Sequence, residues 1–361
     1  MSSITEVARR AGVSPATASR VVSEADYPVS AAARARVLQA ARELDYVPNA
    51  LARGLLKSRV PVVAVMVHDI TDPYFSEVVR GVEDAASASG FLVITCSSER
   101  DADREASYVR LLRSMRAAAV VFAGSGLDDP ESNVEIERHL AAMAADGAAV
   151  VHLSPHAGGE PEVGVDNTAG IAAMVGALVA LGHRRIAFLA GPGGLFVAQE
   201  RLAGYRRGLA EAGLVFDESL AVATTFDSDG GALGIDILLG AGVPFTAICC
   251  ANDLLALGAL RRLAELGFAV PGDISVAGFD DISTAALTAP SLSTVRLPLR
   301  ELGRLGFEHA DSRLTGERPV PIRLPTEVVL RGSTGAPGRG SEGGLVVRAE
   351  VSAAVAVGAD G

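Results

Sequence analysis

The chain has few of the residues that mark a secreted, disulfide-stabilised protein. Its 361 residues include no tryptophan and three cysteines, Cys96, Cys249 and Cys250, and aromatic residues make up 4% of the chain. Three cysteines cannot form a disulfide framework, and two of them are adjacent in an apolar run. We therefore expect reduced core cysteines in a cytoplasmic protein.

Long apolar runs and catalytic arrangements are also missing. No stretch is apolar over the length that spans a bilayer, and the polar N-terminus starts a helix rather than a signal peptide. The six histidines show neither metal-binding spacing nor a Ser/His/Asp or Cys/His arrangement. The glycine-rich segments 124–126 and 191–194 lack the flanks of a nucleophile elbow and a P-loop. The sequence thus predicts no membrane attachment, no metal or other cofactor, and no enzymatic activity.

Charge is distributed unevenly along the chain. Residues 1–60 carry nine Lys and Arg against five Asp and Glu, whereas the whole chain has a formal net charge of −11. The N-terminal segment is therefore +4 and the remainder −15. A basic segment on an acidic body is the distribution that contact with a phosphate backbone requires.

The basic segment has the pattern of three short helices. Ser3 and Glu6 match a capping box, Gly12 permits a sharp turn, and a Ser-Pro pair at 14–15 restarts a helix. Ser30 starts the third helix. Its predicted apolar stripe consists of Val37, Leu38, Ala41 and Leu44.

The second of these helices, residues 15–22, has the size that enters a major groove. An arginine such as Arg20 can bind two acceptors of a guanine, and Thr17 and Ser19 can contact phosphates or bases. Pro15 and Ala16 can offer only apolar contact. We interpret the segment as a helix-turn-helix that reads DNA; the alternative is a small helical subdomain with surface arginines.

From residue 60 onward, apolar runs alternate with amphipathic helices. Continuous apolar runs suit parallel strands that are covered on both faces, and intervening helices give doubly wound sheets. The predicted strands are 60–67, 91–96, 117–124 and 148–154 in a first series, and 184–191, 220–226, 246–251 and 273–280 in a second. The predicted fold class is α/β, with a helix-turn-helix headpiece followed by a body of two lobes.

The predicted ligand site is the cleft between the lobes, because ligands of such sheets bind beyond the carboxyl ends of the strands. Carboxylates, an amide and an arginine can bind ring hydroxyls, while aromatic faces cover apolar sugar faces. Residues with these side chains near strand ends are Asp69, Asp72, Tyr74, Phe75, Arg201, Phe226, Asn252, Asp253, Asp280 and Asp281. Two have other interpretations: Tyr74 as a packing residue, and Asp281 as the cap of a following helix.

Residues 3–332 resemble the lactose-repressor (LacI) family of bacterial transcription regulators. The likeness is carried by AGVSPATASRVVS (11–23), YVPNALARGL (46–55), HDITDPYFSEVVRGVE (68–83), VGVDNTAG (163–170), LGHRRIAFLAGP (181–192), RLAGYRRGL (201–209), CANDLLALGAL (250–260), PGDISVAGFDD (271–281) and LSTVRLPLRELG (292–303). The resemblance implies a periplasmic-binding-protein-like body with two doubly wound parallel sheets.

The resemblance also implies roles for individual residues. Pro15, Ala16 and Arg20 would face bases, and residues 48–56 would fold into a hinge helix on operator DNA. The implied DNA contacts in that helix are Asn49, Ala52 and Leu55, with Leu55 as a minor-groove wedge. The implied effector contacts are Phe75, Arg201, Phe226, Asn252 and Asp280, to which the strand-end argument adds Asp69. Val197 and Leu297 stand where many members have polar residues. These apolar side chains would make the pocket smaller or less hydrated.

We predict four segments: a helix-turn-helix domain (1–47), a hinge and linker (48–60), an effector-binding and dimerisation domain (61–332), and a glycine-rich flexible tail (333–361). The family likeness implies three crossings between the lobes. One lobe would comprise 61–162 with about 293–322, and the other 163–292 with about 323–332.

The predicted protein is an effector-controlled transcription repressor. A homodimer would bind a pseudo-palindromic DNA operator, and a small molecule that closes the cleft would change the DNA affinity. A sugar or sugar derivative is the favoured effector, given the carboxylate, amide, guanidinium and aromatic groups of the cleft. A purine co-repressor and control by a protein partner are the alternatives.

Overall fold

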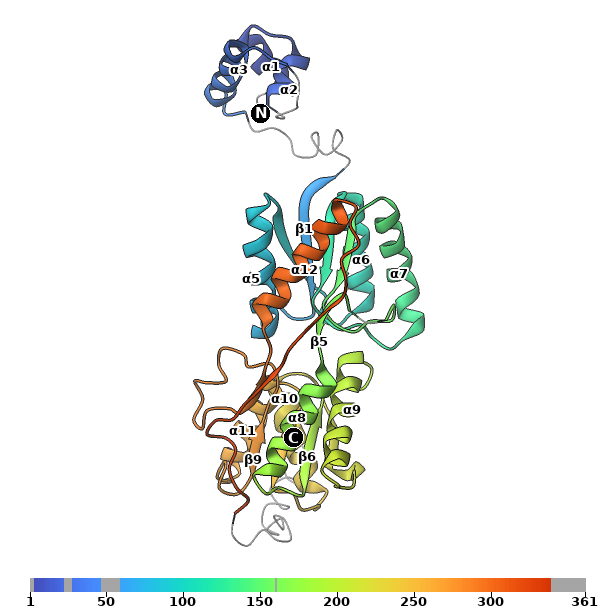
Figure 1. Ribbon diagram of the computed structural model, residues 1–361, viewed down its shortest axis with the longest axis vertical. Coiled ribbons are helices and arrows are strands. Elements are labelled where there is room, and N and C mark those ends of the chain that lie inside the picture. The colour runs from blue at the N-terminus through green and yellow to red at the C-terminus, as the bar shows by residue number, and fades with distance from the viewer. Residues whose placement is uncertain (1–2, 23–27, 47–58, 160, 339–361) are drawn as a thin grey trace, which may run out of the picture.

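The computed structural model describes residues 3–22, 28–46, 59–159 and 161–338 (Figure 1). The N-terminal headpiece consists of α1 (Ile4–Ala11), α2 (Pro15–Val22) and α3 (Ala31–Glu43). The predicted capping box is formed, since Ser3 Oγ accepts from Glu6 N at 3.3 Å and Glu6 Oε2 accepts from Ser3 N at 2.8 Å. Gly12 ends α1 in the left-handed region at φ 65°. The three predicted helices are therefore confirmed.

Small apolar side chains fill the core of the headpiece. Ala18 of α2 is fully buried, and Val37 and Ala40 of α3 lie in the same core. The prediction for Leu38 was wrong, because its side chain is 40% exposed. One residue along a helix turns the side chain by about 100°, so Leu38 lies off the face that Val37 presents to α1 and α2.

The first lobe of the body is a parallel sheet of order β2-β1-β3-β4 between helices. Its strands are β1 (Val60–Val67), β2 (Leu92–Ser97), β3 (Ala117–Phe122) and β4 (Ala149–His152). Its helices are α5 (Pro73–Ala88), α6 (Ala102–Ser114), α7 (Pro130–Ala145) and, from much later in the chain, α12 (Leu299–Leu314). Figure 1 shows α12 beside α5.

The second lobe repeats the design with a parallel sheet of order β7-β6-β8-β9. Its strands are β6 (Ile186–Ala190), β7 (Ala221–Ala223), β8 (Ala247–Cys250) and β9 (Ser275–Ala277), with a short helix η1 (Glu218–Leu220) before β7. Its helices are α8 (Asn167–Ala180), α9 (Phe196–Glu211), α10 (Ser228–Gly240) and α11 (Asp253–Glu265). All eight strands predicted from apolar runs are present: β1 has the predicted bounds, β2 is shifted by one residue, and the other six are shorter than predicted.

Paired glycines allow close helix contact in both lobes. Gly81 of α5 faces Gly303 of α12, and Gly231 of α10 faces Gly258 of α11. A Cβ at any of the four would overlap a backbone carbonyl oxygen of the facing helix. The helix axes could not approach this closely with larger residues, so these glycines set the packing of α12 and α11 on their lobes.

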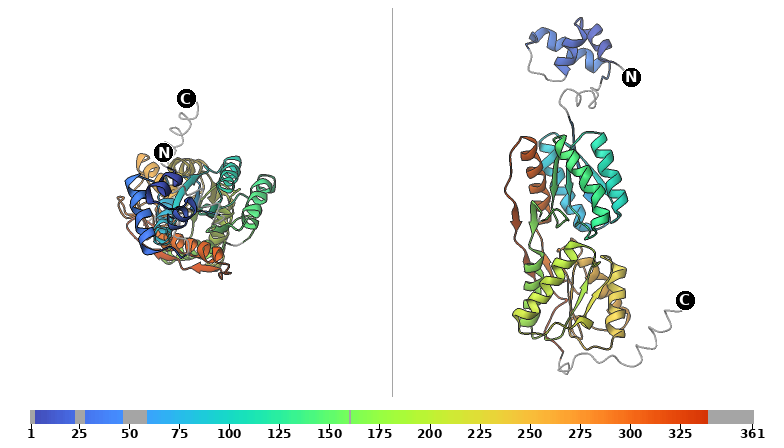
Figure 2. Two further views of the ribbon diagram at one scale, coloured as in Figure 1. Left: turned by 90° about the horizontal axis from the view of Figure 1, so that it is seen from above. Right: turned by 90° about the vertical axis from the view of Figure 1, so that its right-hand side faces the viewer.

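Three chain segments cross between the lobes (Figure 2). They include β5 (Val163–Val165), which pairs in parallel with β11 (Ile322–Leu324), and β10 (Thr294–Arg296), which pairs antiparallel with β12 (Glu327–Val329). A bridge between Asp280 and Arg296 attaches β10 to the second lobe. The chain therefore crosses to the first lobe after Arg296, a few residues later than the predicted crossing near residue 293.

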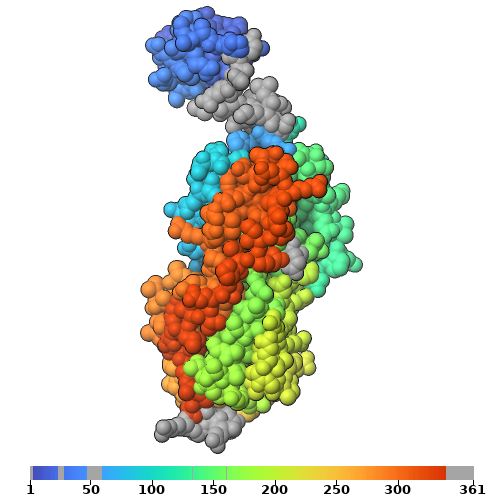
Figure 3. Space-filling model, in the orientation of Figure 1, coloured from blue at the N-terminus to red at the C-terminus, as the bar shows by residue number. Residues whose placement is uncertain are grey.

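The body extends beyond residue 332, where the sequence predicted the start of a flexible tail. Ser333 is fully buried; its Oγ donates to Val276 O at 2.6 Å and accepts from Ser293 N at 2.8 Å. Gly335 O accepts from His183 Nε2 at 2.9 Å. Figure 3 shows this C-terminal segment on the surface of the second lobe. These hydrogen bonds attach residues 333–335 to the body, and residues 339–361 lie outside the described part of the chain.

A membrane-crossing helix is not found among the described residues, since none of their helices is both long and apolar enough.

Candidate functional site

The carboxyl ends of the strands of both sheets meet at a cavity between the lobes. The first lobe contributes His68, Asp72, Tyr74, Phe75, Arg100, Ala123, Gly124, Ser125 and Ser154, and the second contributes Leu195, Val197, Arg201, Phe226, Asn252 and Asp280. The cavity measures about 50 Å³. Pockets that enclose drug-sized ligands measure roughly 300–1,000 Å³. A ligand larger than a few atoms therefore requires the lobes to separate.

Arg201 of α9 is the most constrained polar side chain in this cavity. Its Nε donates to Asn167 Oδ1 at 3.0 Å and its Nη1 donates to Ala251 O at 2.6 Å. Its Nη2 lies 3.3 Å from Asp280 Oδ1, and its Cζ lies 4.2 Å from the ring centroid of Phe279. These contacts fix the plane of the guanidinium, which is the condition for directional binding of a polar ligand.

Asp280, the partner of Arg201, has an uncommon backbone conformation with φ 117°. Its N donates to Val295 O at 2.8 Å and its O accepts from Leu297 N at 3.3 Å, so β10 and the residue after it hold this conformation. Burial raises the pKa of Asp280 well above its usual range, while the charge of Arg201 lowers it. Strained residues of this kind cluster at ligand sites.

Asn252 and two phenylalanines complete the predicted set. Asn252 Oδ1 accepts from Leu255 N at 2.9 Å and caps α11, which leaves the amide NH₂ as the group that can donate to a ligand. The Phe75 ring meets His68 edge to face, with 5.8 Å between centroids. Phe226 lies over Gly191, where a Cβ would overlap its ring. Each lobe thus presents a phenylalanine ring to the cavity, and the first lobe adds the rings of Tyr74 and His68.

The structure brings together five of the six predicted effector residues: Phe75, Arg201, Phe226, Asn252 and Asp280. Asp69 is not among the lining residues. Its Oδ1 accepts from the N and Oγ1 of Thr71 at 2.8 and 2.7 Å, so it stabilises a turn after β1. Asp72, Tyr74 and Val197 line the cavity, whereas the buried Leu297 does not.

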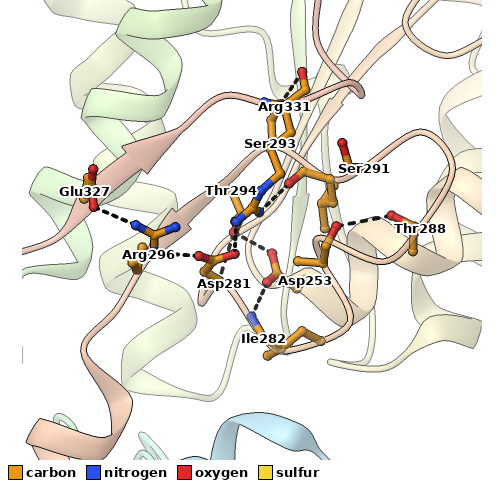
Figure 4. Close-up of polar contacts among 12 residues, drawn as sticks. Asp253, Asp281, Ile282, Thr288, Ser291, Ser293, Thr294, Arg296, Glu327 and Arg331 are labelled. Atoms are coloured by element: carbon orange, nitrogen blue, oxygen red, sulfur yellow. Dashed lines mark hydrogen bonds and ion pairs between the residues drawn. The ribbon is translucent and has the colours of Figure 1, made fainter.

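Asp281 and Asp253 belong to a polar network beside the cavity (Figure 4). Asp281 forms ion pairs of 2.7 Å with both Arg296 and Arg331. No helix begins at Asp281, so its interpretation as a helix cap was wrong. Asp253 Oδ1 accepts from Thr294 Oγ1 at 2.6 Å, and burial raises its pKa to about 7. The network joins the end of the second sheet to the crossing strands.

Arg100 was not anticipated as a residue of the cavity. It follows β2 with φ 60°, and its Cζ lies 5.9 Å from the centroid of Phe226. Its Nε is buried and has no hydrogen-bond partner among the described residues. The only sequence signal is its place after a predicted strand, and a basic residue in such a loop is ordinary.

Burial of His68 makes stability depend on pH. Its Nε2 donates to Ser125 O at 2.9 Å, and burial together with the charge of Arg100 lowers its pKa to about 4. The pKa of His68 in the folded protein lies below its ordinary value of 6.5. The neutral side chain therefore contributes stability that is fully present above pH 6.5 and is lost as the pH falls toward 4. We expect the wild type to lose about 3 kcal/mol more than His68→Gln between pH 7 and pH 4. Urea unfolding at both pH values measures this, and parallel losses would contradict it.

The headpiece presents α2 as its predicted DNA-reading helix. Pro15, Ala16 and Arg20 are exposed, and Thr17 and Ser19 are half-buried. Thr17 Oγ1 lies 2.9 Å from Ser14 Oγ, which caps the helix. The predicted hinge contacts Asn49, Ala52 and Leu55 lie outside the described residues.

A helix-turn-helix headpiece joined to a two-lobed body with a polar cleft defines a ligand-responsive DNA-binding regulator. Comparison with known families agrees: the bacterial regulatory proteins of the lacI family match residues 3–49, and the periplasmic binding protein-like domain matches residues 175–334.

Full-length relatives extend the match. The HTH-type transcriptional regulator DegA of Bacillus subtilis (strain 168) is 32% identical over 335 residues, 92% of this chain and 97% of its own. The HTH-type transcriptional repressor CytR of Escherichia coli (strain K12) is 32% identical over 91% of this chain and 95% of its own. The chain therefore belongs to the LacI family, as a DNA-binding repressor with an effector domain, and not to an enzyme family.

Solved structures show the same architecture. The lac repressor dimer bound to operator and the anti-inducer ONPF has a TM-score of 0.79 and 26% identity, covering 93% of this chain and 99% of its own. The complex of the regulator CelR with cellobiose has a TM-score of 0.68 and 31% identity, covering 92% and 100%. A LacI family regulator from Enterococcus faecium with bound ribose has a TM-score of 0.65 and 27% identity, covering 76% and 99%.

Proposed function

We propose that the cleft binds a sugar or sugar derivative and that this ligand controls operator binding by a homodimer. The proposal rests on the combination of two aromatic side chains, Phe75 and Phe226, with hydrogen-bonding groups from both lobes around the same cavity. Aromatic faces cover the C–H faces of a sugar, and the guanidinium, carboxylate and amide groups match its hydroxyls.

The charges of the cleft favour an uncharged ligand. Arg100 and Arg201 are balanced by Asp72 and Asp280, so these four groups have a formal net charge of zero. A phosphate or carboxylate ligand would leave one of the buried carboxylates without a matching cation, which is costly at low dielectric. A neutral polyhydroxyl compound can use donors and acceptors of both kinds. The solved relatives with cellobiose and ribose support the same class of ligand.

The lobes provide the mechanism by which the ligand would act. Arg201, Asn252 and Asp280 belong to the second lobe, while Asp72, Phe75 and Arg100 belong to the first, so one ligand would contact both. Such a ligand binds an arrangement in which both lobes reach it better than one in which the lobes lie further apart, and it shifts the equilibrium between the two arrangements. Since the headpiece adjoins the first lobe in sequence, a change in the lobe arrangement of a dimer would alter the spacing of the two headpieces. Headpiece spacing sets the affinity for a two-fold operator.

The DNA contacts are proposed to come from α2 and from the hinge. Arg20 would bind a guanine in the major groove, with Pro15, Ala16, Thr17 and Ser19 beside it. Asn49, Ala52 and Leu55 would contact the minor groove from the hinge.

A thermal-melt screen of the full-length protein tests the ligand class. Because the chain has no tryptophan, an extrinsic dye or calorimetry reports unfolding. A sugar at about 100 times its dissociation constant is expected to add roughly 2.7 kcal/mol of stability. A shift with nucleobases and none with sugars would replace the proposal by the purine alternative. Absence of any shift would favour control by a protein partner.

A further inference from the structure

A second cavity lies at the end of the first lobe opposite the cleft. It is bounded by the start of β3, the C-terminal ends of α6 and α7, and Arg59, which immediately precedes β1. Figure 1 places this end of β1 far from the second lobe. Because β1 spans eight residues, the cavity is roughly 25 Å from the cleft. Its volume of about 500 Å³ is in the range of small-molecule sites.

The lining of this cavity is strongly basic in an acidic protein. The lining residues are Arg59, Arg110, Arg113, Ser114, Arg116, Ala117, His139, Met143, Asp146 and Ala148. Four guanidiniums face one carboxylate, whereas the chain as a whole has a formal net charge of −11. A concave basic surface concentrates anions.

Arg59 is held in a preformed slot. Its Nη2 donates to Asp146 O at 3.4 Å, and a Cβ on Gly147 would overlap the guanidinium. Its Nε is buried and has no hydrogen-bond partner among the described residues. A buried donor without a partner is costly, and a ligand acceptor would satisfy it.

The single acid does not neutralise the other cations. Asp146 Oδ2 pairs with Arg113 Nε at 3.1 Å. Among the described residues, neither Arg110 nor Arg116 has a carboxylate partner. Arg113 lies in the last turn of α6, where a positive charge stabilises the helix, and this explains its presence there. Helix stabilisation explains neither the cavity nor the buried Nε of Arg59 that lacks a hydrogen-bond partner among the described residues.

We propose that this cavity binds a phosphorylated small molecule. Arginines bind phosphate oxygens through two parallel hydrogen bonds, and several guanidiniums match a diphosphate or a pair of phosphate groups. Met143, Ala117 and Ala148 provide an apolar floor for the rest of the molecule. Occupancy holds Arg59, which lies in the predicted hinge and linker segment 48–60, and thereby changes DNA affinity; this regulatory step rests on the proposed function.

Calorimetric titration of the full-length protein with sodium pyrophosphate, at constant ionic strength and without DNA, tests the binding site. We expect saturable binding that is at least tenfold weaker in Arg110→Gln/Arg116→Gln and in Arg59→Gln. The control Arg80→Gln/Arg138→Gln removes the same charge from exposed positions of the same lobe and should bind as the wild type. Absence of saturable binding, or an equal loss in the control, would overturn the proposal.

Operator affinity with and without pyrophosphate tests the regulatory step, using a duplex selected from a random pool. We expect the wild type to change its affinity at least fivefold on adding pyrophosphate, and Arg110→Gln/Arg116→Gln to show no change. If this variant binds the duplex more weakly and with a smaller salt slope when no pyrophosphate is present, the arginines contact DNA and the small-molecule site is wrong. Failure to select any duplex would instead count against the proposed DNA reading and leave the calorimetry decisive for the site.

Discussion

Arg201→Ala is expected to abolish the thermal shift by the effector and to destabilise the body by about 3–5 kcal/mol. Arg201 is 6% exposed and its partner Asp280 is 4% exposed, so the substitution leaves a buried carboxylate without its cation. Asn167 Oδ1 and Ala251 O lose their donor at the same time. Urea unfolding measures the loss of stability, and the dye melt with the sugar that shifts the wild type measures the loss of response.

Two further variants separate ligand contact from stability. Arg207→Ala removes an exposed ion pair with Glu211 on the same helix and is expected to leave both the stability and the response close to those of the wild type. Adding Asp280→Asn to Arg201→Ala removes the uncompensated charge. The double variant should therefore recover much of the lost stability but should still show no thermal shift with the effector. A normal thermal shift in Arg201→Ala would show that the effector binds elsewhere.

Arg20→Ala is expected to weaken operator binding by about 1–3 kcal/mol, which corresponds to roughly 5–150-fold in affinity. Arg20 is exposed on α2, so the fold of the headpiece should be unchanged. Fluorescence anisotropy with the selected duplex and with guanine-substituted duplexes measures both affinity and specificity. The loss should shrink when the contacted guanine is replaced.

Arg42→Ala provides the matched comparison in the headpiece. Arg42 lies in the last turn of α3 and is exposed, so its removal changes the charge equally without altering α2. We expect a smaller loss that is the same for every duplex, as for a phosphate contact. Equal losses and equal sequence preference for the two variants would rule out base reading by Arg20.

Local sequence patterns determined the secondary structure. Runs such as 60–67 and 246–251 are apolar without alternation because both faces of their strands are covered, and they became β1 and β8. Ser3, Glu6 and Gly12 placed the ends of α1 because capping depends on neighbours within four residues. These signals are local, so the sequence contains them completely.

The cleft was predictable in part. The strand ends placed Phe226, Asn252 and Asp280 at one edge of the second sheet, and the family likeness singled out Arg201 and Phe75. Asp69 has the same chemistry and follows β1 just as closely, yet a turn formed with Thr71 turns its carboxylate to local hydrogen bonds. The spacing of residues along the chain does not show whether a carboxylate near a strand end binds its own turn or faces the pocket. The three-dimensional geometry decides this.

Other features depended on contacts between distant segments. Ser333 is buried because Ser293 and Val276 bind it, and Asp281 pairs with Arg331 fifty residues later. Arg59 meets Gly147 and Asp146 only after β1 and β4 enter one sheet. The sequence by itself determined the elements, the two-lobed class and the basic headpiece, because periodicity, capping and charge act within a few residues. The tertiary structure alone decided which charged groups are buried together, because a side chain's partner and solvent exposure depend on segments that only folding brings into contact.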